Sequence, residues 1–174
     1  MTELQEQELA TLIEENKIKR ILYLFCRATD RCDIALLQSL YHEDAVHIHG
    51  HYNGPASGFI AAVKTIYARM DSATHHLTNI LIDIDGDVAH SESAALVICA
   101  RDQGEGGERI DLVLSVRFLD RFEKRNGQWK IARRRVVYDT NQSLSPTTRW
   151  DGEYYGAFNN LRGTTSRDDP LYVD

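Results

Sequence analysis

Four long segments of alternating apolar and polar residues, joined by tight-turn signals, constrain the fold of this chain most. They cover residues 75–84, 88–101, 109–124 and 129–141. Asp85-Gly86-Asp87 separates the first two, and Asn126-Gly127, a dipeptide typical of two-residue hairpin turns, separates the last two. Strands joined by such short turns pair antiparallel, so the second half of the chain is predicted to form one antiparallel meander.

The residues before the meander have helical periodicity. Residues 6–30 are predicted as a helix with one apolar stripe, and residues 33–41 as a short helix with Asp33 as its N-cap. A short strand is expected from Ala45 to His51, a turn at 53–55, and a third helix from there to about Met70. Helices followed by long strands indicate an α+β fold, in which a curved antiparallel sheet wraps around the N-terminal helices as a cone-shaped barrel with a cavity.

The length of 174 residues fits one domain, which we expect to span residues 1–142. Residues 143–174 form a polar tail that carries several aromatic side chains, Trp150, Tyr154, Tyr155, Phe158 and Tyr172. Free tails rarely hold so many aromatic residues. The tail is therefore expected to dock on the same domain or on a neighbouring subunit.

Composition argues against several classes of protein. The net charge of −6 disfavours a nucleic-acid partner, which usually requires a basic face. No apolar run approaches the roughly 20 residues of a membrane-spanning helix, and the first sixteen residues do not resemble a signal peptide. Cys26, Cys32 and Cys99 have neither metal-like nor disulfide-like spacing. We expect a cytoplasmic protein with free thiols that binds neither nucleic acid nor membranes.

An acid and a histidine are placed where the predicted fold brings helix ends and strands together. Asp30 ends the first helix, where a carboxylate opposes the helix dipole and is therefore an unusual choice. His75 opens the first long strand, and the adjacent His76 points the other way and is expected at a surface. A carboxylate that orients an imidazole makes a general base near neutral pH. Asp30 and His75 are therefore the predicted catalytic pair.

Four short motifs resemble one known family. They are Leu-Tyr-x-x-x-x-Ala-x-Asp at 22–30, Asp44-Ala45-Val46 with Gly54-Pro55, His75-x-x-x-Asn79, and Phe-Glu-Lys-Arg-Asn-Gly-Gln-Trp-Lys-Ile at 122–131. Their order resembles the SnoaL-like branch of the nuclear-transport-factor-two-like superfamily, and most of all the group containing hexachlorocyclohexane dehydrochlorinase, scytalone dehydratase and bile-acid dehydratase. The resemblance implies the cone-shaped fold, an Asp–His dyad at Asp30 and His75, and eliminations or isomerisations without metal or organic cofactor. It also implies a competitor, since other members are assembly partners of larger oxygenases.

Three further residues are expected to bind substrate. Tyr23 lies seven residues before Asp30 on the same helix face, and Asn79 shares a strand face with His75 if the strand is regular. One of Arg133, Arg134 and Arg135 is expected to stabilise developing negative charge, and we choose Arg135. His47, His49 and His51 alternate along one strand, but no carboxylate or thiolate completes a metal shell, so no metal is expected.

These observations predict a cofactor-independent lyase or isomerase, dehydratase-like, that abstracts a proton from a small, largely apolar substrate, aromatic or polycyclic. The alternative is a non-catalytic small-molecule-binding or assembly subunit, resembling the small subunit of ring-hydroxylating oxygenases. A mechanism in which a carboxylate is itself the base ranks third, because the strands offer no clearly placed second acid. Apolar residues on both strand faces predict a homodimer or trimer, with the segment Trp150 to Phe158 helping to cover a face.

Overall fold

A computed structural model describes residues 1–102, 109–146, 156 and 162–172. Three helices and two short strands precede four long strands, which confirms the predicted α+β class. The elements are α1 (Glu3–Asp30), α2 (Ile34–Ser39), β1 (Tyr41–His49), β2 (Tyr52–Pro55), α3 (Ala56–Tyr67), β3 (Met70–Asp85), β4 (Val88–Asp102), β5 (Arg109–Arg125) and β6 (Gln128–Leu144). In the part of the chain that is described, no helix is long and apolar enough to cross a membrane.

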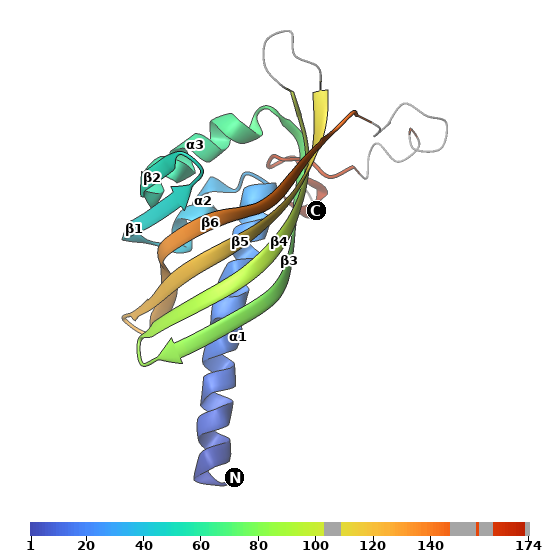
Figure 1. Cartoon of the computed structure of the whole chain (residues 1–174). Coiled ribbons are helices and arrows are strands. Elements are labelled where there is room, and N and C mark those ends of the chain that lie inside the picture. Colours follow the sequence, from blue (N-terminus) through green and yellow to red (C-terminus); the bar gives the residue numbers. More distant parts are fainter. Residues whose placement is uncertain (103–108, 147–155, 157–161, 173–174) are drawn as a thin grey trace.

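The strands form one curved, open sheet in the order β2-β1-β6-β5-β4-β3 (Figure 1). The antiparallel meander from β3 to β6 is as predicted, and Asn126 and Gly127 both have positive φ, as a type I′ hairpin turn requires. The sheet is nevertheless mixed, because β1 pairs with β6 in parallel. The short helix expected over residues 33–41 ends at Ser39, β1 begins at Tyr41 rather than at Ala45, and the predicted turn at 53–55 lies in β2.

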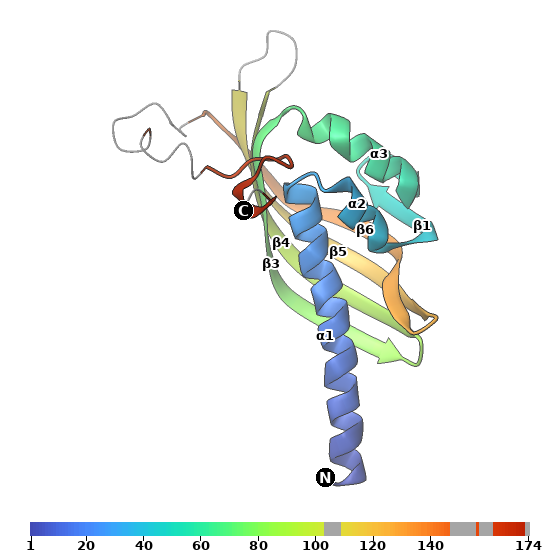
Figure 2. The same ribbon diagram turned by 180° about the vertical axis from the view of Figure 1, so that it is seen from behind.

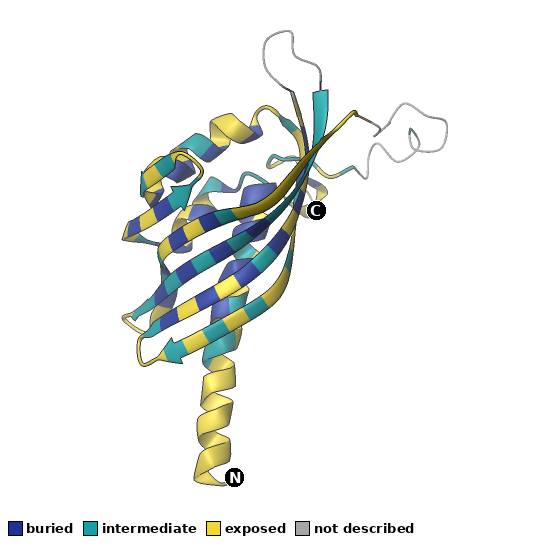
Figure 3. Cartoon of the chain, viewed as in Figure 1, coloured by how far each residue is buried: buried dark blue, intermediate teal, exposed yellow. Residues whose placement is uncertain are grey.

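Helix α1 crosses the side of the sheet that the other helices also cover (Figure 2). A capping box between Thr2 and Gln5 begins it. Only its C-terminal half is covered by the sheet, so Leu4, Leu9, Leu12 and Ile13 in the protruding half are exposed (Figure 3). The apolar stripe therefore extends beyond the part of the helix that packs in this chain.

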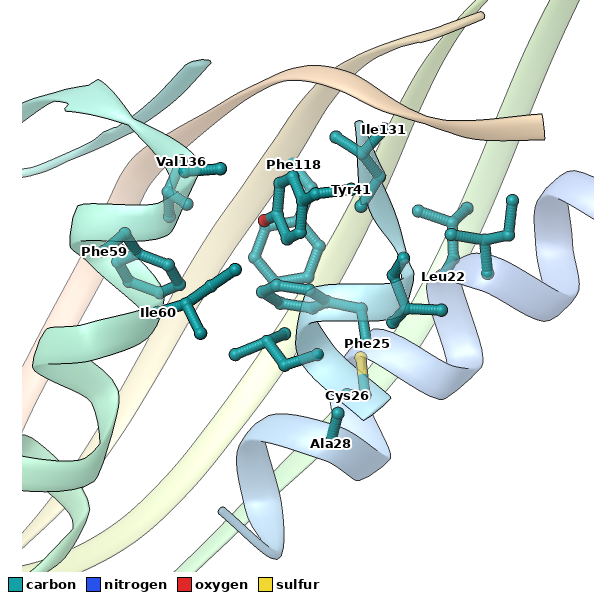
Figure 4. Packing of buried hydrophobic residues seen from close by; sticks show 14 of the residues in the cluster. Leu22, Phe25, Cys26, Ala28, Tyr41, Phe59, Ile60, Phe118, Ile131 and Val136 are labelled. Carbon is teal, nitrogen blue, oxygen red and sulfur yellow. The ribbon is translucent and has the colours of Figure 1, made fainter. Parts of the chain in front are cut away.

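The core lies between α1, α3 and the concave face of the sheet. Figure 4 shows Phe25 of α1, Tyr41 of β1 and Phe118 of β5 clustered there. Phe25 meets the other two rings edge-on, with centroids 6.3 and 5.6 Å apart. Phe25 and Phe118 also line the cavity of the concave face.

A β-bulge in β3 changes which residues face the core. Thr78 pairs with Ala94 and Leu81 with Glu92, so Asn79 and Ile80 both lie opposite Ser93. Before the bulge His75 and Leu77 point inward, whereas after it the inward side chains are Ile80, Ile82 and Ile84, which pack against the core. The regular alternation assumed from the sequence is therefore wrong beyond Thr78, and Leu81 is exposed.

Candidate functional site

The concave face contains a cavity of about 340 Å³. Its wall is mainly apolar and includes Phe25, Phe59, Val63, Val97, Leu112, Leu114, Val116, Phe118 and Val136. Its polar side chains come from different elements: Thr29, His49, Tyr67, His75, Arg101 and Tyr138. A mostly apolar cavity with a few polar groups is typical of a site for a small molecule.

The structure brings Asp30 and His75 together at this cavity. One carboxylate oxygen, Oδ1, lies 2.5 Å from Nδ1 of the His75 ring, and the other, Oδ2, accepts the backbone N–H of His75 at 2.9 Å. Both side chains are largely buried, while His75 lines the cavity. A carboxylate at Nδ1 favours the tautomer that carries its proton there, which leaves Nε2 with a free lone pair. The arrangement has the form of an oriented base.

The turn after Asp30 is fixed by local contacts and by the C-terminal segment. Cys32 has a φ of +50°, and Asp33 caps α2 by accepting the backbone N–H of Leu36 at 3.1 Å. Arg31 pairs with Asp169 at 3.2 Å, and Arg167 donates to Asp33 at 2.8 Å. The described part of the tail thus binds behind the dyad. The aromatic segment Trp150 to Phe158, expected to cover a face, lies outside the described residues apart from Gly156.

The other predicted site residues lie away from the cavity. Tyr23 lies about 10 Å along the helix axis from Asp30 and is 54% exposed. Its neighbour Leu22 is buried, so the Tyr23 side chain points away from the covered side of α1. Asn79 is exposed at the bulge, where its φ of +44° explains the residue type, since asparagine tolerates the left-handed conformation. Neither residue lines the cavity. The structure therefore gives no support to their predicted substrate-binding roles.

The structure does not place Arg135 at the cavity either, because Arg134 is the inward arginine. Arg135 is exposed, whereas Arg134 is fully buried and donates to both carboxylate oxygens of Asp120 at 2.8 and 2.6 Å. Its guanidinium lies 3.7 Å from the centre of the Phe25 ring and 4.4 Å from that of Phe118. Burial pulls the pKa of Arg134 down, but Asp120 holds it above its ordinary value. Arg134 is therefore a charged support beneath the cavity floor.

The three alternating histidines separate into two environments. His47 and His49 point inward, while His51 follows the turn at Gly50 and is exposed. Burial, with a smaller effect of Arg134, lowers the pKa of His47 to about 2; burial, then the charge of His75, lowers that of His49 to about 4. In the described part of the chain, no three His, Cys, Asp or Glu side chains gather as a metal site.

Sequence reasoning missed the polar partners of the cavity. His49 Nε2 lies 2.5 Å from the hydroxyl of Tyr138, and the buried Tyr67 of α3 also lines the cavity. The shared face of Arg134 and Tyr138 on β6 was visible in the sequence as an alternation. The alternation does not show which of the two faces points inward, because only the packing of the sheet decides that.

Comparisons with known proteins agree with this architecture. Residues 10–135 match the model of the SnoaL-like domain, so the chain belongs to that family, within the superfamily of nuclear-transport-factor-two-like proteins. No curated protein matches the chain significantly.

Solved structures share the fold over most of their length. A candidate scytalone dehydratase from Novosphingobium aromaticivorans is 24% identical with a TM-score of 0.67, over 80% of this chain and 96% of that one. A protein of unknown function from Mycobacterium tuberculosis is 26% identical with a TM-score of 0.63, over 74% and 77%. A type-2 hexachlorocyclohexane dehydrochlorinase is 16% identical with a TM-score of 0.72, over 84% and 98%. At such identities the likeness establishes the fold rather than the reaction.

Proposed function

We propose that the chain is a cofactor-independent lyase or isomerase of the dehydratase kind, with His75 as the general base. The observation that carries the proposal is the contact of Asp30 with Nδ1 of a histidine that lines an apolar cavity. Nε2 removes a proton from a substrate carbon, and Asp30 stabilises the imidazolium that forms. Asp30 itself is held behind the ring by both its oxygens, so it is not the base.

The cavity supports a small, largely apolar substrate, aromatic or polycyclic. Its volume of about 340 Å³ suits a small molecule, and its wall of phenylalanine and aliphatic side chains favours the binding of apolar surface. Solved dehydratase-like and dehydrochlorinase structures with the same fold support an elimination. Substrates in the cavity lose a proton next to an activating group, and the electron pair either expels a leaving group or shifts a double bond.

Hydrogen exchange on carbon tests the base without knowledge of the natural substrate. The purified protein is incubated in D₂O with small carbonyl C–H acids that fit the cavity, 2-tetralone among them, and deuterium uptake is followed by NMR. Replacing His75 by Ala should lower the enzymatic exchange rate by about 10²–10⁴-fold. The matched control is His76→Ala, because the neighbouring ring points away from the cavity. If no compound exchanges faster with the native protein than with His75→Ala, the chain is instead a binding or assembly subunit.

A further inference from the structure

A second polar pair faces the cavity and has no part in the Asp30–His75 contact. It consists of His49 of β1 and Tyr138 of β6, and both side chains line the cavity. Their Nε2 and hydroxyl oxygen are 2.5 Å apart. The two strands are neighbours in the sheet, with His49 paired to Val136, so the pair is built into the parallel β1–β6 ladder.

The pair continues into the core as a chain of hydrogen bonds. Nδ1 of His49 lies 3.5 Å from Nε2 of His47, the longest and weakest bond of the chain. Nδ1 of His47 lies 2.9 Å from the hydroxyl of Tyr41. The His47 ring is fully buried and stacked on Phe59 with 3.6 Å between centroids. Its position is therefore fixed by packing on one face and hydrogen bonds at both nitrogens.

If both imidazole rings are neutral and every hydrogen bond is made, the series of hydrogen bonds from Tyr41 to Tyr138 can run in only two directions. Burial holds the pKa of His47 and of His49 well below neutrality, so each ring has one N–H donor and one lone pair at pH 7. In one orientation every proton points from Tyr41 toward Tyr138. In the other every proton points from Tyr138 toward Tyr41.

The buried end of the chain selects between the two orientations. Tyr41 is 4% exposed, and among the described residues its hydroxyl has a single hydrogen-bond partner, His47. If His47 donated to it, the Tyr41 proton would be buried without an acceptor. That loss disfavours the orientation by roughly tenfold or more. Tyr41 therefore donates to His47, His47 to His49, and His49 to the oxygen of Tyr138.

We propose that Tyr138 is a catalytic hydrogen-bond donor whose hydroxyl proton is directed into the cavity by Tyr41, His47 and His49, and that the substrate carries a carbonyl oxygen conjugated with the carbon that His75 deprotonates. With its oxygen already accepting from His49, the hydroxyl of Tyr138 has its proton left for a ligand. The substrate class rests on the proposed function, whereas the direction of the hydrogen-bond chain does not.

The positions of the two groups on the sheet indicate why conjugation is needed. Tyr138 pairs with Val116, which pairs with Ala95, which pairs with Leu77, two residues from His75 on the same face. Three strand spacings are about 14 Å along the sheet, and the two side chains converge from its concave face. Negative charge that develops at the deprotonated carbon thus reaches the tyrosine by delocalisation onto the carbonyl oxygen.

The steps balance without a co-reactant. The C–H bond breaks, its proton moves to Nε2 of His75, and its electron pair forms an enolate whose oxygen accepts the hydrogen bond of Tyr138. In an elimination the enolate reforms the carbonyl, the bond to a β-hydroxyl breaks, and the departing oxygen takes the proton from the imidazolium and leaves as water. In an isomerisation the imidazolium returns the proton to another carbon of the conjugated system.

Nitrogen-15 NMR of the imidazole rings tests the direction of the chain. The ring nitrogens distinguish the two neutral tautomers, and assignment uses His47→Gln and His49→Gln proteins. The expected result at pH 7 is a proton on Nε2 of both His47 and His49. A proton on Nδ1 of either ring would mean that the hydrogen bonds at that ring run in the opposite direction. This result would overturn the proposal, whether or not His75 proves to be the base.

Binding of 2-naphthol and naphthalene, followed by fluorescence, tests the donor. The two probes share an aromatic skeleton, and only 2-naphthol offers an oxygen. Tyr138→Phe should reduce the affinity ratio of 2-naphthol to naphthalene by about tenfold, since one good hydrogen bond is lost. Tyr23→Phe, which removes an exposed hydroxyl outside the cavity, should leave the ratio unchanged. An unchanged ratio in Tyr138→Phe overturns the proposal.

A third variant separates this proposal from the proposed function. His75→Ala should lower deuterium exchange on 2-tetralone by about 10²–10⁴-fold and still retain the preference for 2-naphthol. Tyr138→Phe should slow that exchange by about tenfold or more, mainly in kcat, because the lost hydrogen bond strengthens as the enolate forms. An effect confined to KM would make Tyr138 a binding residue only and would contradict the catalytic role.

Discussion

The carboxylate of Asp30 binds His75 at two points, the ring through Oδ1 and the backbone N–H through Oδ2. The first contact sets the tautomer of the ring, and the second holds the backbone of His75 on β3 against the end of α1. An acid at a helix C-terminus is unfavourable for the helix dipole, and these two bonds compensate for it. The pair thus joins the helix to the sheet and orients the candidate base at the same time.

Replacing Asp30 by Asn should reverse the tautomer of His75. The amide oxygen can still accept the backbone N–H, so its NH₂ group faces Nδ1 and donates to it, which moves the ring proton to Nε2. Nitrogen-15 NMR reads the tautomer directly, and exchange on 2-tetralone should fall by about 10²–10⁴-fold. Asp83→Asn, on the outward face of the same strand, is the control. An unchanged tautomer in Asp30→Asn would contradict the assigned orientation.

Arg134 and Arg135 should differ sharply in their effect on stability. Arg134→Met leaves the carboxylate of Asp120 buried without its partner, which should lower the free energy of unfolding by about 3–5 kcal/mol. Arg135→Met, at the exposed neighbour, should change it by less than about 0.5 kcal/mol. Urea denaturation measures both. The double variant Arg134→Met with Asp120→Leu should recover part of the loss, and no recovery would mean that the pair itself stabilises the fold.

Stability should fall between pH 7 and pH 5 because of His47. Its pKa is about 2 in the folded protein and about 6.5 when unfolded, so below pH 6.5 the unfolded chain binds a proton that the folded one does not. The neutral His47 ring therefore contributes fully to the free energy of unfolding above pH 6.5, and this contribution should be about 2 kcal/mol smaller at pH 5. His47→Gln should be less stable overall and flatter in its pH dependence. His51→Gln, at an exposed ring, should keep the native slope in the same thermal scans.

Substitutions of Asn79 should affect stability, through the backbone conformation at this position, rather than ligand binding. Its positive φ is unfavourable for β-branched residues, so Asn79→Val should lower the free energy of unfolding by about 1–2 kcal/mol. Asn79→Gly should leave it nearly unchanged, because glycine adopts this conformation readily. Chemical denaturation tests the stabilities, and 2-naphthol titration tests the site. A large loss of 2-naphthol affinity in the stable glycine variant would show instead that the Asn79 side chain binds the ligand.

The outward face of the sheet supports the expectation of a homodimer or trimer. Leu81, Leu96 and Ile98 are 68%, 42% and 43% exposed on β3 and β4. Such apolar side chains on a sheet face favour association. Sedimentation should show an oligomer that Leu96→Glu with Ile98→Glu converts to monomer, while Leu171→Glu in the C-terminal segment leaves it intact. A monomeric native protein at micromolar concentration would contradict the expectation.

The sequence predicted the elements that depend on local physics. Helical periodicity located α1, the Asp33 side chain located the start of α2, and Asn126-Gly127 located the last hairpin. The contact between Asp30 and His75 was also within reach. Asp30 ends α1, and the order of the elements brings that helix end against β3, although β3 begins at Met70 rather than at His75 as expected. Helices, caps and tight turns are determined by a few neighbouring residues, so they can be predicted from the sequence of those residues alone.

Which other residues face the cavity depends on how the helices and strands pack together. Short-range sequence patterns do not contain this information. A single bulge at Asn79 reversed the inward and outward sets of β3, and the sequence shows no unambiguous sign of an inserted residue. The helix face shared by Tyr23 and Asp30 was correctly periodic, yet only tertiary packing decides which side chains along that face are covered. Arg134 was separated from Arg135 in the same way, since alternation gives two faces but not which one packs on Phe25. Burial is a property of the assembled layers, so these assignments were settled only by tertiary structure.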